Sequence, residues 1–292
     1  MKSILILGGC GYIGSELFLI LDGLGYSVST IDLELNGNYV NPNNVRQDVS
    51  DITAKDLEEY DVIINFAAHS SVAMANNRKR EALEDGIVNF FDLLQKVGSK
   101  KFIYASSSSV YNGLTQTEAN EESDFFNVSN LYDLTKLFAD KLAKLYSDRF
   151  YALRFGTVCG HSPNLRTDVM INKMVHSAIN EGKIVIYNKN INRPILGIRD
   201  LCNAVRCLIE RDGEPGFYNL ASLNATIMEI GNSVAEIMDV PLVDMGETDT
   251  YDFKISSDKF CRTYDFEFRE DIRSIVEDIK QNWDAKQQGV RI

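Results

Sequence analysis

The fold of this chain is indicated by residues 3–14, which read Ser3-Ile4-Leu5-Ile6-Leu7-Gly8-Gly9-Cys10-Gly11-Tyr12-Ile13-Gly14. The apolar run predicts a buried strand, the glycines a tight turn, and the amphipathic stretch from Glu16 to Leu24 a helix. In such a unit Gly8 allows the turn, Gly11 lets the backbone approach a pyrophosphate at the helix N-terminus, and Gly14 lets the helix pack on the strand. The stretch therefore predicts a dinucleotide-binding site.

Asp32 ends the next apolar segment, Tyr26 to Leu33, and strengthens this interpretation. A carboxylate at this place accepts hydrogen bonds from the adenosine ribose of NAD and repels the additional phosphate of NADP. The residues that follow, Leu33-Glu34-Leu35, contain no Arg to offset that repulsion. We therefore expect NAD as the cofactor. The alternatives are a ligand-free turn and an Asp32 that only caps it.

Composition excludes several classes of partner. The 292 residues carry a formal net charge of -12, which argues against nucleic acid and against anionic membranes, because both are polyanions. No signal segment precedes the first strand and no apolar run approaches membrane-spanning length, so we expect a cytoplasmic protein. The five cysteines are scattered without C-x-x-C spacing, which indicates neither a disulfide framework nor a metal site.

Strands and helices alternate through the first half of the chain, which predicts an α/β fold with a doubly wound parallel sheet. The expected strands have continuous apolar runs, as in sheets that are covered on both faces. They are Ser3–Leu7, Tyr26–Leu33, Val62–Phe66, Lys101–Ala105 and Tyr151–Phe155. The expected helices start near Glu16, near Ala54, near Glu81 and at Asn130.

The order of helices and strands changes in the second half of the chain, which predicts a smaller, interleaved substrate-binding lobe. We expect residues 1–155 to form the NAD-binding Rossmann domain, with return elements near residues 198–221, and residues 156–292 to form the lobe. The expected elements are helices near 168–180, 200–211 and 226–238, strands near 183–187 and 217–220, and two helices between Ile255 and Trp283.

Tyr132 and Lys136 stand four residues apart in the long helix, so both side chains can point into one cleft. A nearby ammonium favours the phenolate, which allows Tyr132 to exchange a proton with a hydroxyl group while hydride moves at the adjacent carbon. Ser107 follows a strand at the carboxyl edge of the sheet, where open α/β folds bind ligands. A pair at this spacing is often only a helix-surface contact, and a serine run is often only a polar turn.

Taken together, these residues resemble the extended short-chain dehydrogenase/reductases, in particular the NAD-dependent sugar-nucleotide epimerases and dehydratases. The likeness covers nearly the whole chain and includes Gln47-Asp48-Val49, Phe66-Ala67-Ala68, Val110-Tyr111, Leu153 to Val158, Arg193 ahead of Asp200, and Tyr218-Asn219-Leu220.

The resemblance implies a set of site residues. Ser107, Tyr132 and Lys136 would be catalytic. The cofactor would be held by Gly8, Gly11, Tyr12, Ile13, Gly14, Asp32, Asp48, Val49, Phe66, Ala67, Ala68, Phe155, Tyr132 and Lys136. The substrate would be held by Ser71, Ser107, Thr157, Asn172 and Arg193. Arg166 is a weaker candidate for substrate binding, and we expect its side chain to be solvated.

The resemblance also implies the reaction. Tyr132 would remove a sugar hydroxyl proton as hydride passes to NAD, and an epimerase would then return the hydride to the other face of a transient keto-sugar. A 4,6-dehydratase needs an Asp-Glu pair where Ser108 and Ser109 stand, so dehydration is disfavoured. A sugar-nucleotide reductase or dehydrogenase and a non-catalytic dinucleotide-binding regulatory protein are the alternatives.

Three departures from the family pattern concern the substrate. A second phosphate-binding Arg is missing near Thr250 and Tyr251, Gly86 stands where relatives often have Asn, and Thr157 stands where several UDP-sugar epimerases have Asn. Family members often dimerise through the helices that correspond here to 81–97 and 130–147. We therefore expect a homodimer that acts on a nucleotide sugar, with neither nucleic acid nor membrane as a partner.

Overall fold

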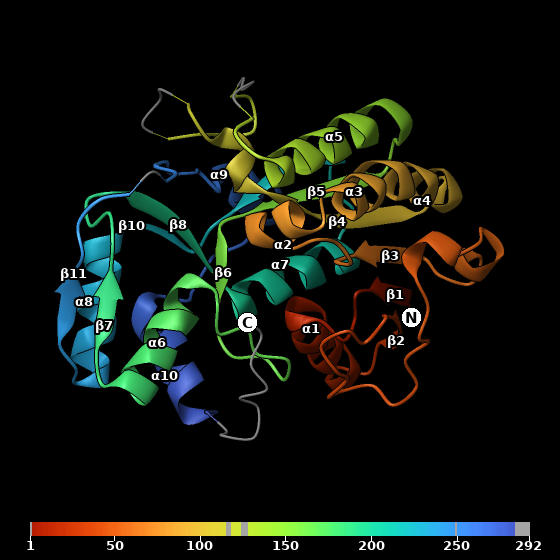
Figure 1. Cartoon of the computed structure of the whole chain (residues 1–292). Helices are drawn as coiled ribbons and strands as arrows, with labels where there is room; N and C mark the ends of the chain where they lie inside the picture. The colour runs from red at the N-terminus through yellow and green to blue at the C-terminus, as the bar shows by residue number, and fades with distance from the viewer. Residues whose placement is uncertain (1, 115–117, 124–127, 249, 284–292) are drawn as a thin grey trace.

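Figure 1 shows the computed structural model of the chain, which describes residues 2–114, 118–123, 128–248 and 250–283. Its main sheet has six strands, β1 (Ser3–Leu7), β2 (Ser27–Ile31), β3 (Val62–Asn65), β4 (Lys101–Ser107), β5 (Phe150–Phe155) and β9 (Gly216–Leu220). Their order is β2-β1-β3-β4-β5-β9, and every neighbouring pair is parallel. The strand order reverses beside β1, so the predicted doubly wound α/β fold is confirmed.

Helices cover both faces of this sheet (Figure 1). On one face pack α1 (Tyr12–Gly23), α7 (Ile198–Glu210) and α9 (Asp258–Tyr264), and on the other pack α4 (Phe90–Val97) and α5 (Leu131–Tyr146). In β1, Ile4 and Ile6 join the core under α1 and α7, while Leu5 and Leu7 join the core under α4 and α5. Because successive side chains point to opposite faces, burial on both sides requires the continuous apolar run.

The segment between β3 and β4 is helical over most of its length. It contains α2 (Val72–Asn77), α3 (Lys79–Leu83), a π-helical turn (Glu84–Asn89) and α4. A Cβ on Gly86 in the π turn would lie 2.6 Å from Cβ of Thr135, so glycine permits close packing of this turn on α5.

The prediction of a helix from about Ala54 is wrong. Only a 3₁₀ turn, Lys55–Leu57, forms there. The Asp56 carboxylate accepts hydrogen bonds from the Thr53 amide at 2.8 Å and from the Thr53 hydroxyl at 2.7 Å, and these local bonds stabilise a turn.

A second group of elements packs beside the main sheet (Figure 1). Its strands are β6 (Thr157–Cys159), β8 (Asn192–Gly197) and β10 (Leu223–Thr226) in one small sheet, and β7 (Ile184–Ile186) and β11 (Leu242–Asp244) in another. Its helices are α6 (Met170–Glu181), α8 (Ile227–Met238) and α10 (Ile272–Gln281), which share one apolar core. Four of these strands, β6, β8, β10 and β11, were not expected from the sequence.

The chain crosses between the two parts several times. It leaves the main sheet after β5, enters β6, returns through β8 and α7 to β9, and leaves again into β10. Because the chain crosses in this way, the residues that follow β5 and β8 lie close to the carboxyl edge of the main sheet. Within the described ranges, no helix has the length and apolar character needed to span a membrane.

Candidate active site

The glycine turn between β1 and α1 forms a cradle for a dinucleotide. Gly8 has a positive φ of 81°, and a Cβ on Gly14 would lie 2.1 Å from the Gly8 carbonyl oxygen, so both positions require glycine. A Cβ on Gly11 would meet only that oxygen, at 3.3 Å, which leaves the space above Gly11 open. Gly11 is the N-cap of α1 and has no capping side chain, so the first N–H groups of the helix can bind an anion. This cradle fits the pyrophosphate of NAD.

Asp32 lies beside the cradle, directly after β2. Its Oδ2 accepts a hydrogen bond from the Cys10 amide at 3.0 Å, and its Oδ1 accepts one from the Glu34 amide at 2.7 Å. These two bonds hold the carboxylate at the carboxyl edge of the sheet, where the ribose hydroxyls of NAD would bind it.

Four further predicted cofactor residues lie at the carboxyl ends of β3 and β5. Phe66, Ala67 and Ala68 follow β3, and Phe155 ends β5. The rings of Phe66 and Phe155 meet edge to face with their centroids 6.1 Å apart. They form an apolar wall between the two strand ends, as a nicotinamide ring requires.

Asp48 and Val49 lie in the connection between β2 and β3. Asp48 is the N-cap of the 3₁₀ turn Val49–Asp51, and its carboxylate accepts from the Ser50 amide at 2.9 Å. Val49 packs partly against the core under α4 and α5. Both residues are half-buried.

A loop from the second group of elements closes over the cradle. The sequence did not predict this contact. The Tyr12 hydroxyl donates to the Gly160 carbonyl at 2.9 Å, and the Ser162 hydroxyl donates to the Tyr12 carbonyl at 2.6 Å. The Asn164 amide donates to the Cys10 carbonyl at 2.6 Å. Because the Tyr12 side chain joins the two parts, only the backbone of Tyr12 and Ile13 in the first turn of α1 remains to face the cofactor.

Helix α5 carries Tyr132 and Lys136. Asn130 caps the helix by accepting a hydrogen bond from the Asp133 amide at 3.0 Å, which fixes where its first turn begins. The ammonium of Lys136 lies 5.7 Å from the centre of the Tyr132 ring and donates to the Ala105 carbonyl of β4 at 2.8 Å. Burial lowers the pKa of Lys136 to about 8. The two side chains thus face the end of β4.

Ser107 is the last residue of β4 and lies next to Tyr132. Its Oγ is 2.8 Å from Oγ of Ser109 and accepts from the Ser109 amide at 3.2 Å. Burial raises the pKa of Tyr132, whereas a hydrogen bond with Ser107 and the charge of Arg166 act in the opposite direction. The structure therefore brings together Ser107, Tyr132 and Lys136 at the carboxyl edge of the sheet.

The residues predicted to hold the substrate are spread over several elements. Ser71 caps α2 by accepting from the Met74 amide at 3.2 Å, and Thr157 begins β6. Arg193 in β8 is half-buried, and it donates hydrogen bonds to the Tyr251 carbonyl and to the Thr250 hydroxyl. Burial lowers the pKa of Arg193.

Asn172 is fully buried and does not face a cleft. Its Oδ1 accepts from the Gly160 amide at 3.0 Å, and its Nδ2 donates to the Tyr12 hydroxyl at 3.1 Å and to the Arg166 carbonyl at 2.8 Å. The amide is therefore occupied by the loop that closes over the cradle. The expected contact between Asn172 and the substrate stays a prediction.

Arg166 is buried, so its expected exposure to solvent is wrong. Its guanidinium binds Asp168 through Nε at 2.9 Å and through Nη2 at 2.6 Å, and its Nη1 donates to the Ser70 hydroxyl at 3.0 Å. The Ser70 contact places this cation beside the loop that follows β3. Asp168 is two residues away in the sequence, whereas Ser70 comes from a distant segment, so only the folded chain shows the Ser70 contact.

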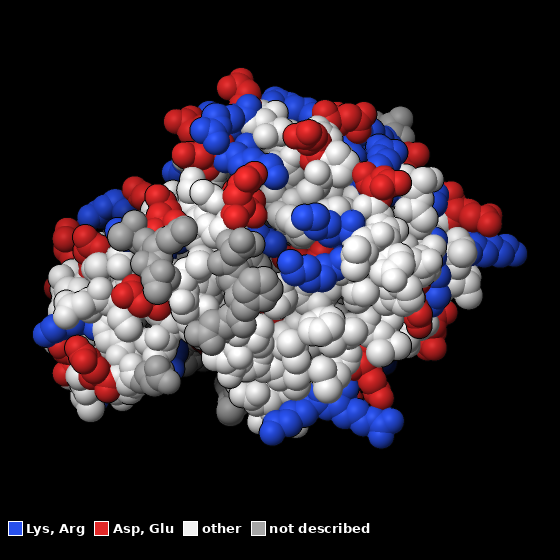
Figure 2. Space-filling view, turned by 90° about the horizontal axis from the view of Figure 1, so that it is seen from above, with Lys and Arg blue, Asp and Glu red and all other residues white. Residues whose placement is uncertain are grey.

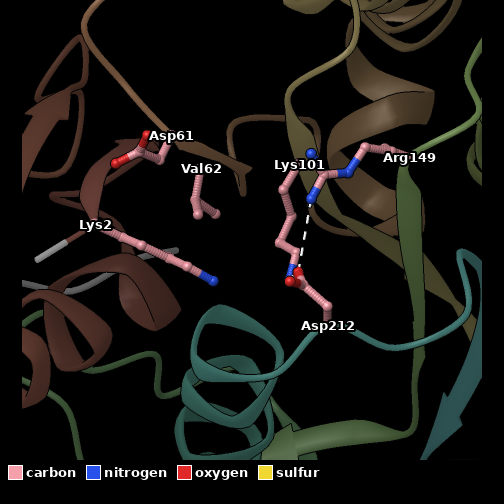
Figure 3. A pocket seen from close by; sticks show the side chains of 6 residues that line it. All are labelled: Lys2, Asp61, Val62, Lys101, Arg149 and Asp212. Atoms are coloured by element: carbon pink, nitrogen blue, oxygen red, sulfur yellow. Dashed lines mark ion pairs between the residues drawn. The ribbon is translucent and has the colours of Figure 1, made fainter.

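A hollow of about 460 Å³ lies at the amino edge of the sheet, opposite the carboxyl edge (Figure 3). It is lined by Lys2, Asp61, Val62, Lys101, Arg149 and Asp212. The buried ammonium of Lys101 donates to the Leu208 carbonyl at 2.7 Å and pairs with Asp212 at 3.0 Å. This cation stabilises the C-terminal end of α7, so the hollow is not a candidate active site.

Comparison with known proteins finds relatives that match most of this chain. The chain is 28% identical over 240 residues to the protein CapI of Staphylococcus aureus, covering 73% of this chain and 70% of CapI. It is 26% identical over 270 residues to a UDP-glucose 4-epimerase of Halalkalibacterium halodurans, covering 82% and 79% of the two chains. Dehydratases of dTDP-D-glucose are also among its relatives.

The fold is shared with solved structures. MoeE5 in complex with UDP-glucuronic acid and NAD superimposes with a TM-score of 0.82 at 21% identity, covering 94% of this chain and 97% of MoeE5. Residues 4–221 match the model of the NAD dependent epimerase/dehydratase family, and NAD is therefore the cofactor. The chain belongs to the NAD dependent epimerase/dehydratase family.

Proposed function

We propose that this protein is an NAD-dependent epimerase of a nucleotide-diphosphate sugar. The observation that carries the proposal is the meeting of Ser107, Tyr132 and Lys136 at the carboxyl edge of the sheet, beside the dinucleotide cradle. NAD, which the glycine turn from Gly8 to Gly14 and Asp32 would hold, would supply a reversible hydride acceptor for the sugar carbon. The three side chains supply the proton transfer that must accompany the hydride transfer.

Each of the three side chains has a separate task in the proposal. Tyr132 takes the proton of a sugar hydroxyl and returns it after the keto-sugar has turned in the site. Lys136 places a positive charge 5.7 Å from the Tyr132 ring, which stabilises the phenolate form. Ser107 holds the reacting oxygen next to Tyr132 through its hydroxyl.

Epimerisation is favoured over dehydration because of the residues after β4. Ser108 and Ser109 are both buried and follow Ser107, where the resemblance would place the Asp-Glu pair of a 4,6-dehydratase. Neither hydroxyl is an acid near neutral pH. The loop around Ser162 and Asn164 also closes over the cradle, which favours a cofactor that stays bound through many turnovers.

We further propose that Arg193 binds the substrate diphosphate and that Arg166 favours a sugar with an anionic group. Arg193 lies half-buried beside Thr250 and Tyr251. Arg166 is buried, and while two of its nitrogens bind Asp168, its Nη1 donates to the Ser70 hydroxyl in the loop that follows β3. The solved complex of MoeE5 with UDP-glucuronic acid shows that this fold can accept an acidic sugar.

The test is proton NMR of the purified protein with UDP-, GDP-, CDP- and dTDP-sugars, neutral and acidic, and catalytic NAD. A new stereoisomer at constant NADH, absent with Tyr132→Phe, would establish epimerisation. Formation of NADH in proportion to product would indicate a dehydrogenase.

A preference for the acidic sugar that disappears in Arg166→Met would support the role of Arg166, and equal turnover in both proteins would refute it.

The affinity of the free enzyme for NAD is expected to fall as the pH rises through about 8. Burial lowers the pKa of Lys136 to about 8, so its positive charge is present below that pH and is lost above it. Between about pH 7 and about pH 9, the cationic fraction of Lys136, and with it NAD affinity, should fall by up to about tenfold. Fluorescence titration with NAD measures this. Lys136→Met should bind more weakly at all pH values and show no such fall.

We propose a homodimer that forms through α4, α5 and the π turn before α4. Exposed apolar side chains gather on these elements, with Val88 at 55%, Phe138 at 44% and Leu145 at 74% exposure. Figure 2, which looks onto α4 and α5, shows a broad uncharged area with Lys, Arg, Asp and Glu around it. A second copy of the chain would bury these apolar side chains.

Charged residues on this face are expected to produce a monomer. Phe138→Asp combined with Leu145→Glu would place carboxylates in the apolar interface, where they would lose their hydration. Light scattering coupled to gel filtration should show a dimer for the natural protein and a monomer of unchanged helix content for the variant. A monomeric natural protein would contradict the proposed interface.

A further inference from the structure

Glu34 places a second carboxylate beside Asp32, shortly after β2. Its backbone lies in the left-handed region, with a φ of 56°, which costs free energy for a residue other than glycine. Its Oε1 accepts hydrogen bonds from Nδ2 of Asn38 at 2.8 Å and from Nδ2 of Asn44 at 3.0 Å. The same Asn44 nitrogen donates to the Asp32 carbonyl at 3.1 Å. The Glu34 carboxylate is therefore fixed next to the residue that would bind the adenosine ribose of NAD.

The charges of both carboxylates act on the glycine turn. The Cys10 amide donates to Asp32 at 3.0 Å, and burial, followed by the charges of Asp32 and Glu34, raises the pKa of the Cys10 thiol to about 12. NADP differs from NAD by one phosphate on the adenosine ribose, which would bring further negative charge to this place. Because like charges repel over several ångströms, two carboxylates disfavour this phosphate more strongly than Asp32 alone.

The fold also brings an arginine to this place, although none stands directly after Asp32 in the sequence. Val45 pairs with Ile31 at the end of β2, and Arg46 follows it. Nε of Arg46 donates to the Leu33 carbonyl at 3.2 Å, and the residue is exposed. A guanidinium held there would attract the additional phosphate of NADP. The repulsion by the carboxylates is therefore opposed by a cation that only the folded chain shows.

We propose that Glu34 is a specificity-determining residue, whose carboxylate offsets the attraction of Arg46 for the ribose phosphate of NADP and so keeps the site selective for NAD. Asp32 would bind the ribose hydroxyls, while Glu34, which Asn38 and Asn44 hold, would act through its charge. The inference concerns the choice of cofactor, so it does not depend on which sugar the protein converts.

The test is the affinity for NADH and for NADPH, measured by fluorescence titration of the natural protein and of Glu34→Gln. Glutamine keeps an oxygen that accepts from both asparagines and removes only the charge. We expect NADPH to bind about tenfold more tightly to the variant, the effect of one unit charge a few ångströms from the phosphate, with little change for NADH. Unchanged affinity for both cofactors would show that Glu34 only anchors its loop, and would overturn the proposal.

The double variant Glu34→Gln with Arg46→Met tests the cation. Loss of the guanidinium should remove the gain for NADPH and leave the affinity for NADH nearly as it was, because NADH lacks the phosphate that Arg46 would attract. Added salt should likewise reduce the gain in Glu34→Gln, since exposed charges are screened. A gain that persists without the guanidinium would contradict the role of Arg46.

Two control variants separate the charge of Glu34 from other effects. Asn38→Ala removes one hydrogen bond to the carboxylate and keeps the charge, so the preference for NADH should remain. Glu59→Gln makes the same change in net charge at the amino edge of the sheet, where the Ser3 hydroxyl donates to the Glu59 carbonyl at 2.6 Å, and should change neither affinity. A gain for NADPH in either control as large as in Glu34→Gln would assign the effect to loop loosening or to total charge, and would refute the proposal.

Discussion

Tyr132→Phe is expected to lower the rate of sugar conversion by about a thousandfold, within the usual range for loss of a general acid-base group. The variant keeps the ring that packs near Lys136 and removes only the hydroxyl that exchanges the proton. Because the ring still fills its place on α5, KM for the nucleotide sugar and the fold should change little. Proton NMR of the sugar and near-ultraviolet circular dichroism measure the two properties.

The NAD content of this variant is the control. The cradle at Gly8, Gly11 and Gly14 and the carboxylate of Asp32 do not involve the Tyr132 hydroxyl, so NAD should remain bound. Loss of NAD together with loss of activity would show only that the site had collapsed. Full activity in a protein that retains NAD would contradict the assignment of Tyr132 as the acid-base group.

Arg154→Met is expected to destabilise the protein by about 3 to 5 kcal/mol, the usual effect of removing one partner from a buried ion pair. Arg154 lies in β5 and its Nε binds the Asp140 carboxylate in α5 at 2.9 Å, with both side chains almost completely buried. The Tyr104 hydroxyl also donates to Asp140 at 2.9 Å. Without the guanidinium, the Asp140 charge is left in the core without its countercharge.

Urea denaturation followed by circular dichroism measures this loss. The matched control is the double variant Arg154→Met with Asp140→Leu, which removes both charges and should recover a substantial part of the stability. Since Asp140 is on the helix that carries Tyr132 and Lys136, the single variant should also lose activity. A single variant as stable as the natural protein would show that this ion pair does not hold α5 to the sheet.

Local sequence determined the dinucleotide half of the molecule. The run from Ser3 to Leu7 is buried on both faces as expected, and the glycine turn has the geometry that its spacing predicts. Tyr132 and Lys136 share a face because they are one helical turn apart. These features depend on residues close in sequence, so their patterns could be interpreted without the fold.

Prediction from the sequence failed at one local turn and at several places where distant segments meet. The helix expected near Ala54 is a 3₁₀ turn, because Thr53 and Asp56 bind each other locally. The strands β6, β8 and β10 were missed because each is stabilised by pairing with partners far along the chain.

The sequence by itself determined the fold class, the family resemblance and the shared helix face of Tyr132 and Lys136, because glycine geometry, strand apolarity and helical spacing are local properties. Only the tertiary structure decided that Asn172 joins the two parts and that Arg166 is buried beside Ser70. These roles depend on which side chains long-range packing brings together. A buried polar group must find its partner wherever the fold places one, and no sequence spacing records that partner.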